Sequence, residues 1–203
     1  IYAFKTNKLV KYLSEDHRLE GSNDFGKDII PRIYATDRVF TYDYVHAEGT
    51  RAYWRDIGTI NSYYESNMDL VSVTPQLNLY DREWLIRTNM EQWPPAKMIF
   101  DEGERRGVAL NSIISNGAIV SGAKVSGSII SPGVKVNSYA EVLNSIVFHS
   151  VTIGRRARIK NAIIDKYVSI PEGEEIGYDL EKDGQRFTVS AEGFVVVPKG
   201  YVF

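Results

Sequence analysis

The C-terminal half of this chain repeats itself with a fixed period. From Ile114 onward, isoleucine or valine returns about every six residues, and every third member of the series falls in one column. Two of the three columns step by 17 residues throughout, and the column that starts at Ile114 steps by 16, 17 and 17. The twelve positions are Ile114, Ile119, Val125, Ile130, Val136, Val142, Val147, Ile153, Ile159, Ile164, Ile170 and Ile176. Such self-similarity predicts a repeat architecture.

Hexads grouped in threes are typical of a parallel β-helix with a triangular cross-section. Each coil would contain three short strands, and each strand would point one β-branched side chain toward the axis. Isoleucine and valine suit this position because they are stiff at χ1 and pack well on a pleated surface. Pairs with turn propensity, such as Asn116-Gly117 and Pro132-Gly133, fall where the corners must turn. The alternative is a sandwich of antiparallel strands, which would give alternation without a fixed 17-residue register.

Composition excludes several classes of function. Lysine and arginine number 24 against 26 aspartates and glutamates, a formal net charge of −2, which indicates no basic surface for nucleic acid or an anionic membrane. The sequence has no cysteine, so a disulfide framework, a thiolate metal site and a cysteine nucleophile are excluded. No apolar run approaches the roughly 18 residues of a membrane helix. We expect a cytoplasmic protein.

The N-terminal half shows no repeat and predicts alternating strands and helices. Residues 1–4 and 39–45 have the pattern of strands. Thr6 is a candidate N-cap for a first helix, and Asp24 is a candidate N-cap for a short second helix that stops near Pro31. This mixture is typical of the last part of an α/β domain.

A third helix is predicted from residue 60 to about residue 70, with Thr59 as its N-cap. We expect residues 1–74 to form the α/β part, residues 75–105 to form a connector packed by its aromatic side chains, and residues 106–203 to form the β-helix.

The segment YWRDIGT at residues 53–59 is the most informative candidate site. Asp56 stands two residues before Gly58 and just before a helix N-cap, where a carboxylate can project toward a phosphate-bound divalent cation. Trp54 could supply an apolar wall for a sugar. The structural alternatives are a surface ion pair between Arg55 and Asp56, a core position for Trp54 and a capping role for Asp56.

The three histidines do not predict a zinc site, because His17, His46 and His149 lie far apart in the sequence. His149 lies on a predicted coil, and hexapeptide-repeat acyltransferases use a coil histidine as general base. No long loop interrupts the coils to build a pocket for such an activity. An acyltransferase therefore stays a minor alternative, which coenzyme A binding would test.

Three segments together resemble the C-terminal part of bacterial glucose-1-phosphate adenylyltransferase: SNDFGKDIIP at residues 22–31, YWRDIGT, and the PPAK at residues 94–97 that leads into the repeat. The resemblance covers essentially all 203 residues. It implies a Rossmann-like nucleotidyltransferase domain followed by a left-handed parallel β-helix. It also implies the reaction of ATP with α-D-glucose 1-phosphate to give ADP-glucose and pyrophosphate for glycogen or starch synthesis, in a homotetramer controlled by sugar-phosphate and nucleotide effectors.

The resemblance assigns roles by position. It implies that Asp56 is a catalytic residue that binds Mg²⁺, that Trp54 lies in the glucose-binding wall, and that Asp24 supports the substrate pocket. Lys166 and Lys199 match basic residues of the effector-binding cleft. Some relatives have arginine at these two positions, and lysine keeps the charge without the bidentate geometry. The identity of the effector therefore stays open.

Several parts of the family's site have no counterpart in these residues. The glycine-rich phosphate loop, the first metal-binding aspartate and the lysine that holds the sugar phosphate are missing from the sequence, which opens on Ile1. We therefore expect a fragment that is inactive by itself. The alternative is a non-catalytic regulatory or assembly subunit of the same enzyme. YWRDIGT favours the enzyme, because a subunit without catalysis needs no aspartate at the metal position.

Overall fold

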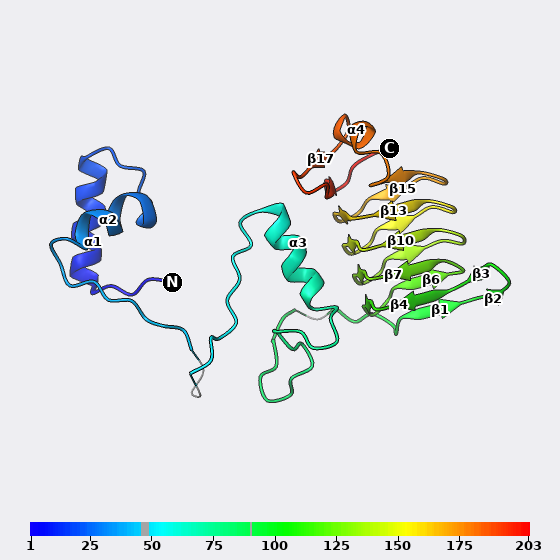
Figure 1. Cartoon of the computed structure of the whole chain (residues 1–203), viewed down its shortest axis with the longest axis horizontal. Helices are drawn as coiled ribbons and strands as arrows, with labels where there is room; N and C mark the ends of the chain where they lie inside the picture. Colours follow the sequence, from blue (N-terminus) through cyan, green and yellow to red (C-terminus); the bar gives the residue numbers. More distant parts are fainter. Residues whose placement is uncertain (46–48, 90) are drawn as a thin grey trace. The chain divides into compact units, whose positions relative to one another are not determined.

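The structure is a computed structural model that describes residues 1–45, 49–89 and 91–203. His46, one of the three histidines considered above, lies outside the described residues. The chain forms two compact units, Ile1–Ala52 and Tyr53–Phe203. Figure 1 shows both, and each is described here by itself.

The first unit is built from helices around a small apolar cluster. Its elements are α1 (Thr6–Arg18), a π-helical turn η1 (Phe25–Ile29) and α2 (Ile30–Ile33). Tyr12, Ile29 and Ile33 are buried between them. The predicted capping role of Asp24 is confirmed, because its Oδ1 accepts hydrogen bonds from the backbone N–H groups of Gly26 and Lys27 at 2.7 and 2.9 Å.

A buried carboxylate ties these helices together. Asp16 is fully buried and accepts hydrogen bonds from the Arg32 guanidinium and from the backbone N–H of Asn23, the latter at 2.9 Å. A Cβ at Gly21 would collide with the Asp16 carboxylate, so the loop can approach it only with glycine there. The ion pair therefore fixes the loop that leads into Asp24.

Other predictions for this unit are wrong. Residues 1–4 and the described residues 39–45 form no strand, and only an isolated bridge joins Val45 to Arg51. No described strand pairs with either segment, so their backbone N–H and C=O groups have no neighbouring strand with which to form the hydrogen bonds of a sheet. Lys5, not Thr6, is the N-cap of α1, and no side chain caps this helix. Pro31 does not stop the second helix but lies in the first turn of α2, where a missing N–H is tolerated.

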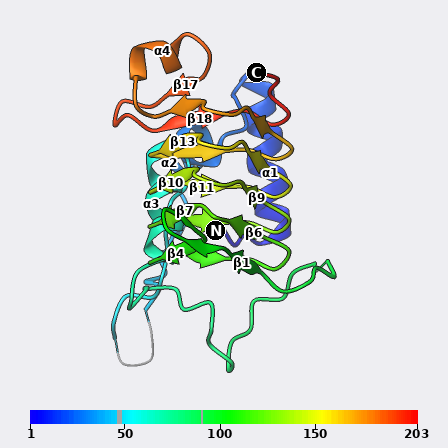
Figure 2. The ribbon, with the colours of Figure 1, turned by 90° about the vertical axis from the view of Figure 1, so that its right-hand side faces the viewer.

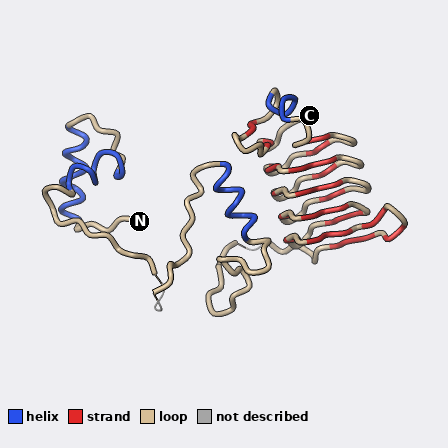
Figure 3. Tube along the Cα trace, in the orientation of Figure 1, coloured by secondary structure: helices blue, strands red, loops and turns tan. Residues whose placement is uncertain are grey.

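The predicted parallel β-helix is confirmed in the second unit, where three sheets stack coil upon coil (Figures 2 and 3). The first sheet contains β1 (Lys97–Ile99), β6 (Ile119–Ser121), β9 (Lys135–Val136), β12 (Thr152–Ile153) and β15 (Ser169–Ile170). The second contains β4 (Val108–Leu110), β7 (Lys124–Ser126), β10 (Glu141–Leu143), β13 (Arg158–Lys160) and β16 (Glu175–Ile176). The third contains β5 (Ile113–Ile114), β8 (Ile129–Ile130), β11 (Ile146–Val147), β14 (Ala162–Ile164), β18 (Val195–Val197) and β17 (Thr188–Val189). Antiparallel pairing is confined to β17 with β18 and to the hairpin of β2 (Asp101–Glu102) and β3 (Arg105–Arg106) among the described strands.

The predicted columns form the axis of the β-helix, with one correction. Val136, Ile153 and Ile170 are paired across neighbouring coils and are buried. Ile119 does not belong to this column, because Val120 pairs with Val136 and is fully buried. The reason is that the coil of β6, β7 and β8 has five residues from Val120 to Val125, whereas the next coil has six from Val136 to Val142. The step from coil to coil is therefore 16 residues at this point.

Aromatic side chains pack on the β-helix at its C-terminal end and at two of its corners. At the C-terminal end lie α4 (Leu180–Gly184) and a cluster of aromatic rings that includes Phe187 and Tyr201. In the connector, the Trp93 indole lies against Gly117 and Gly133, where a Cβ would come within 2.6 and 2.9 Å of the ring. Trp84, by contrast, is exposed. The predicted aromatic packing of the connector is therefore confirmed for Trp93 and wrong for Trp84. The domain boundaries at residues 74 and 105 stay a prediction.

Candidate functional site

Asp56 lies on an exposed turn that leads directly into α3 (Ile60–Asp69). Its Oδ1 accepts a hydrogen bond from the backbone N–H of Gly58 at 3.1 Å. No hydrogen bond from the described residues reaches its second oxygen. The turn therefore orients the carboxylate and leaves one oxygen available to a ligand.

The structure decides between the structural alternatives for this segment. Trp54 is 67% exposed, so it is not a core residue. Arg55 and Asp56 form no ion pair with each other. Helix α3 is capped by Thr59, as predicted, through a capping box in which Thr59 and Ser62 exchange hydrogen bonds. The exposed indole and carboxylate stay candidates for contact with a ligand.

Helix α3 is docked on the outer face of the third sheet. The outward-facing residues of this sheet form an apolar column of Ile113, Ile129, Ile146, Ile163 and Val196. Helix α3 and neighbouring rings pack against the last four of these residues. Tyr64 is the anchor: its ring stacks on Phe194 with centroids 3.9 Å apart, and its hydroxyl donates to the backbone carbonyl of Asn144 at 2.7 Å. Because α3 is held here, the turn that precedes it is held too.

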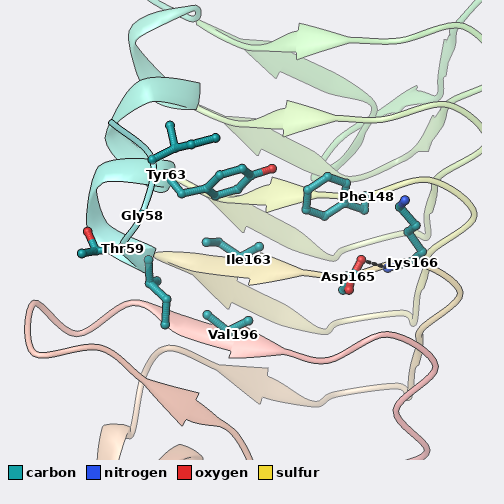
Figure 4. Close-up of a pocket in the computed structure, with 10 residues that line it drawn as sticks. Gly58, Thr59, Tyr63, Phe148, Ile163, Asp165, Lys166 and Val196 are labelled. Carbon is teal, nitrogen blue, oxygen red and sulfur yellow. Dashed lines mark hydrogen bonds between the residues drawn. The ribbon is translucent and has the colours of Figure 1, made fainter. Parts of the chain in front are cut away.

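A cavity of about 470 Å³ lies between the start of α3 and the sheet (Figure 4). Its wall is mostly apolar, with one acidic and one basic residue at its edge. The lining residues are Ile57, Gly58, Thr59, Ile60, Tyr63, Phe148, Ile163, Asp165, Lys166 and Val196. Burial, and less strongly the charge of Asp165, raises the pKa of the Tyr63 hydroxyl. The cavity brings Lys166 to the segment that follows Asp56.

Lys166 and Lys199 lie on adjacent corners of the β-helix. The backbone N–H of Gly200 donates to the carbonyl of Lys166 at 3.0 Å, which stacks one corner on the other. The Lys199 ammonium lies 5.6 Å from the centre of the Tyr167 ring. His149 shares a hydrogen bond of 3.1 Å with the Tyr167 hydroxyl at this exposed corner and does not line the cavity. The structure thus stacks the two corners that carry the predicted effector residues, and His149 lies outside the cavity that Lys166 lines.

The described residues supply a single carboxylate for a metal ion at this segment. Across residues 1–45, 49–89 and 91–203, no three His, Cys, Asp or Glu side chains come together in a way that could hold a metal ion. Asp56 alone offers a free carboxylate oxygen on the candidate turn. Mg²⁺ is commonly held by one or two carboxylates together with substrate phosphates. One ligand from this chain is compatible with that arrangement, while Asp24 belongs to the other unit and is occupied as a cap.

The docking of α3 was not predicted from the sequence, although a signal for it exists. Ile113, Ile129, Ile146 and Ile163 repeat at steps of 16, 17 and 17, each directly before a member of the inward-facing series. A second apolar column on a strand must face outward, since side chains alternate between faces. An outward column of isoleucines requires a cover, and Tyr64 and its neighbours on α3 supply it.

Comparison with known proteins assigns the two parts of the chain to families. Residues 94–197 match the family described as GlmU-like, C-terminal hexapeptide, and residues 1–73 match the family described as nucleotidyl transferase. The chain therefore belongs to the GlmU-like hexapeptide family. The predicted fold class, a β-helix preceded by part of a nucleotidyltransferase, is confirmed.

The relatives share one name. A glucose-1-phosphate adenylyltransferase of Methylococcus capsulatus is 49% identical over 97% of this chain and 47% of its own length. Proteins of the same name from Koribacter versatilis and Rhodopirellula baltica are 45% and 50% identical, over 99% and 98% of this chain and 49% and 46% of their own lengths. The predicted resemblance is thus confirmed, and the chain spans about half the length of the curated relatives it matches. No helix in the described part of the chain is both long and apolar enough to cross a membrane.

Proposed function

We propose that the polypeptide to which this chain belongs is a glucose-1-phosphate adenylyltransferase, which makes ADP-glucose and pyrophosphate from ATP and α-D-glucose 1-phosphate. The observation that carries the proposal is identity of 45–50% over nearly the whole chain to relatives of that name. The exposed, oriented carboxylate of Asp56 supports it, because nucleotidyl transfer depends on positioning and charge stabilisation around phosphates. The product would serve glycogen or starch synthesis.

In the reaction, an oxygen of the sugar phosphate attacks the α-phosphorus of ATP and the bond to the pyrophosphate group breaks. The residues of this chain position the reactants. The Gly58 N–H holds the Asp56 carboxylate toward the phosphates, and the indole of Trp54 covers the apolar face of the glucose ring. Mg²⁺, bound by Asp56 and the phosphates, would lower the negative charge that the two reactants present to each other. Asp24 would act indirectly, since its side chain is engaged as a helix cap.

Regulation belongs to the same proposal. Lys166 and Lys199 would bind a phosphate-bearing effector at the two stacked corners that carry them. A lysine ammonium is a point charge and cannot bind a phosphate through two parallel hydrogen bonds as an arginine guanidinium can. The two lysines would therefore select an effector by its negative charge more than by its shape. The open strand edges of the β-helix, at β1 and β4, would serve assembly of a homotetramer.

A substrate panel tests the proposed function. The complete gene product is assayed with Mg²⁺ and with ATP or UTP, each paired with glucose 1-phosphate and with other hexose phosphates. We expect kcat/KM to be highest for ATP with glucose 1-phosphate, by at least about tenfold over each other pair. A clear preference for UTP or for another hexose phosphate would reject the assignment. Coenzyme A is included as a ligand, and its binding would favour the acyltransferase instead.

A further inference from the structure

Helix α3 lies between two sites that the proposed function keeps apart. It begins directly after the turn that carries Asp56. Its side covers the third sheet, and two strands of this sheet, β14 and β18, run toward the corners that carry Lys166 and Lys199. Within the unit Tyr53–Phe203, one helix therefore touches both the candidate catalytic segment and the elements that hold the candidate effector residues (Figures 1 and 4).

Tyr64 makes the best-defined contact between α3 and the β-helix. Its side chain is 8% exposed, its ring stacks on Phe194 at an interplanar angle of 27°, and its hydroxyl donates to the Asn144 carbonyl. Burial raises the pKa of this hydroxyl above its ordinary value, which already keeps a tyrosine protonated and a donor at neutral pH. A stacked ring and a buried hydrogen bond together fix both the position and the rotation of the helix.

The stacking partner of Tyr64 leads to the effector corner. Phe194 directly precedes β18, and Lys199 follows the end of the same strand by two residues. Strand β18 pairs with β14 through Ile163 and Val196, which also face the cavity beneath α3. A displacement of β18 at the corner that carries Lys199 would therefore also move Phe194, on which the Tyr64 ring stacks.

We propose that Tyr64 is a positioning residue that links the corner of Lys166 and Lys199 to Asp56 by holding α3 on the third sheet. The inference rests on the proposed function and goes beyond it by naming the residue through which the two sites are coupled. Coupling is reciprocal: an anion at the corner favours the docked helix, and the docked helix favours binding of the anion. Tyr64 touches neither ligand and acts only through the helix.

The first test measures the tether itself, in this chain and without activity. Hydrogen–deuterium exchange is compared for the wild type, Tyr64→Phe and Tyr178→Phe. Tyr64→Phe keeps the stacked ring and removes the hydroxyl, and we expect the hydrogen-bonded amides in the first turns of α3, residues 62–64, to exchange about fivefold faster. Tyr178 is the matched control, because it is a partly buried tyrosine whose hydroxyl meets Glu141 on the second sheet. Equal exchange of residues 62–64 in all three proteins would overturn the tether.

The second test measures the coupling, in the complete gene product. The rate of ADP-glucose formation is measured with and without 3-phosphoglycerate, fructose 6-phosphate or inorganic phosphate. For the compound that changes the wild-type rate most, we expect Tyr64→Phe to reduce that change at least about threefold while the KM for ATP stays within twofold, and Tyr178→Phe to match the wild type. A wild-type rate that no compound changes, or equal responses in both variants, overturns the proposal.

The two tests separate this inference from the proposed function. Absence of ADP-glucose formation in the wild type would reject the adenylyltransferase assignment, and with it the link to catalysis. The exchange measurement would still show whether Tyr64 holds α3. A lower melting temperature with an unchanged response to effectors would show a purely structural tyrosine, and it counts against the coupling.

Discussion

Replacement of Asp56 by asparagine is expected to lower the rate of ADP-glucose formation at least about a hundredfold in the complete gene product. Asparagine keeps an oxygen for the Gly58 N–H, so the turn and the start of α3 are preserved. It removes the negative charge that a phosphate-bound Mg²⁺ needs from this chain. Turnover is measured under saturating substrate, together with thermal unfolding, which we expect to be unchanged.

Asp81 offers a matched control for Asp56. Its Oδ1 accepts a hydrogen bond from the backbone N–H of Glu83 at 2.8 Å, which is the same kind of local turn. Asp81→Asn therefore makes the same chemical change at a position without a predicted ligand, and its rate should stay within about twofold of the wild type. Full activity in Asp56→Asn would contradict the catalytic role and favour the non-catalytic subunit. An equal loss in both variants would point to a general effect of the substitution.

Truncation of Ile153 is expected to cost about 2–5 kcal/mol of stability. Ile153 is fully buried on β12 and is paired with Val136 and Ile170 on the coils to either side. Ile153→Ala leaves a cavity on the axis, where side chains of successive coils stack and have little room to close it. The measurement is urea unfolding followed by far-UV circular dichroism, read as the shift in midpoint at constant slope.

The neighbouring residue provides the control for this substitution. Thr152 lies on the same strand with its side chain on the other face and is only partly buried. Thr152→Ala should change the free energy of unfolding by no more than about 0.5 kcal/mol. Similar shifts in the two variants would contradict the assignment of inward and outward faces, on which the whole register rests.

The sequence predicted the β-helix well because its evidence repeats. Each coil presents the same inward-facing residue types, so an error at one position, such as Ile119 in place of Val120, does not disturb the others. The first unit offered single, unrepeated patterns. Its expected strands fail since alternation says nothing about whether a neighbouring strand exists.

For the site, local chemistry was predictable and long-range packing was not. The turn at Asp56 follows from Gly58 and the N-cap at Thr59, all within a few residues. The cavity that joins this segment to Lys166 depends on the docking of α3 on the third sheet, where the lining residues Phe148 and Ile163 lie more than 80 residues after Tyr63 in the chain. In the sequence, only the outward-facing isoleucine column indicates that something must cover the third sheet, and it does not indicate that α3 is the cover.

The assignment as an adenylyltransferase is tested most directly by ³¹P NMR of the complete gene product mixed with ATP, glucose 1-phosphate and Mg²⁺. We expect the signals of ADP-glucose and pyrophosphate to grow in equal amounts as those of ATP and glucose 1-phosphate fall. Asp56→Asn in the same tube conditions should leave the substrate signals nearly unchanged. Spectra in which glucose 1-phosphate persists while ATP gives ADP and phosphate, or in which the wild type leaves both substrates intact, would contradict the assignment.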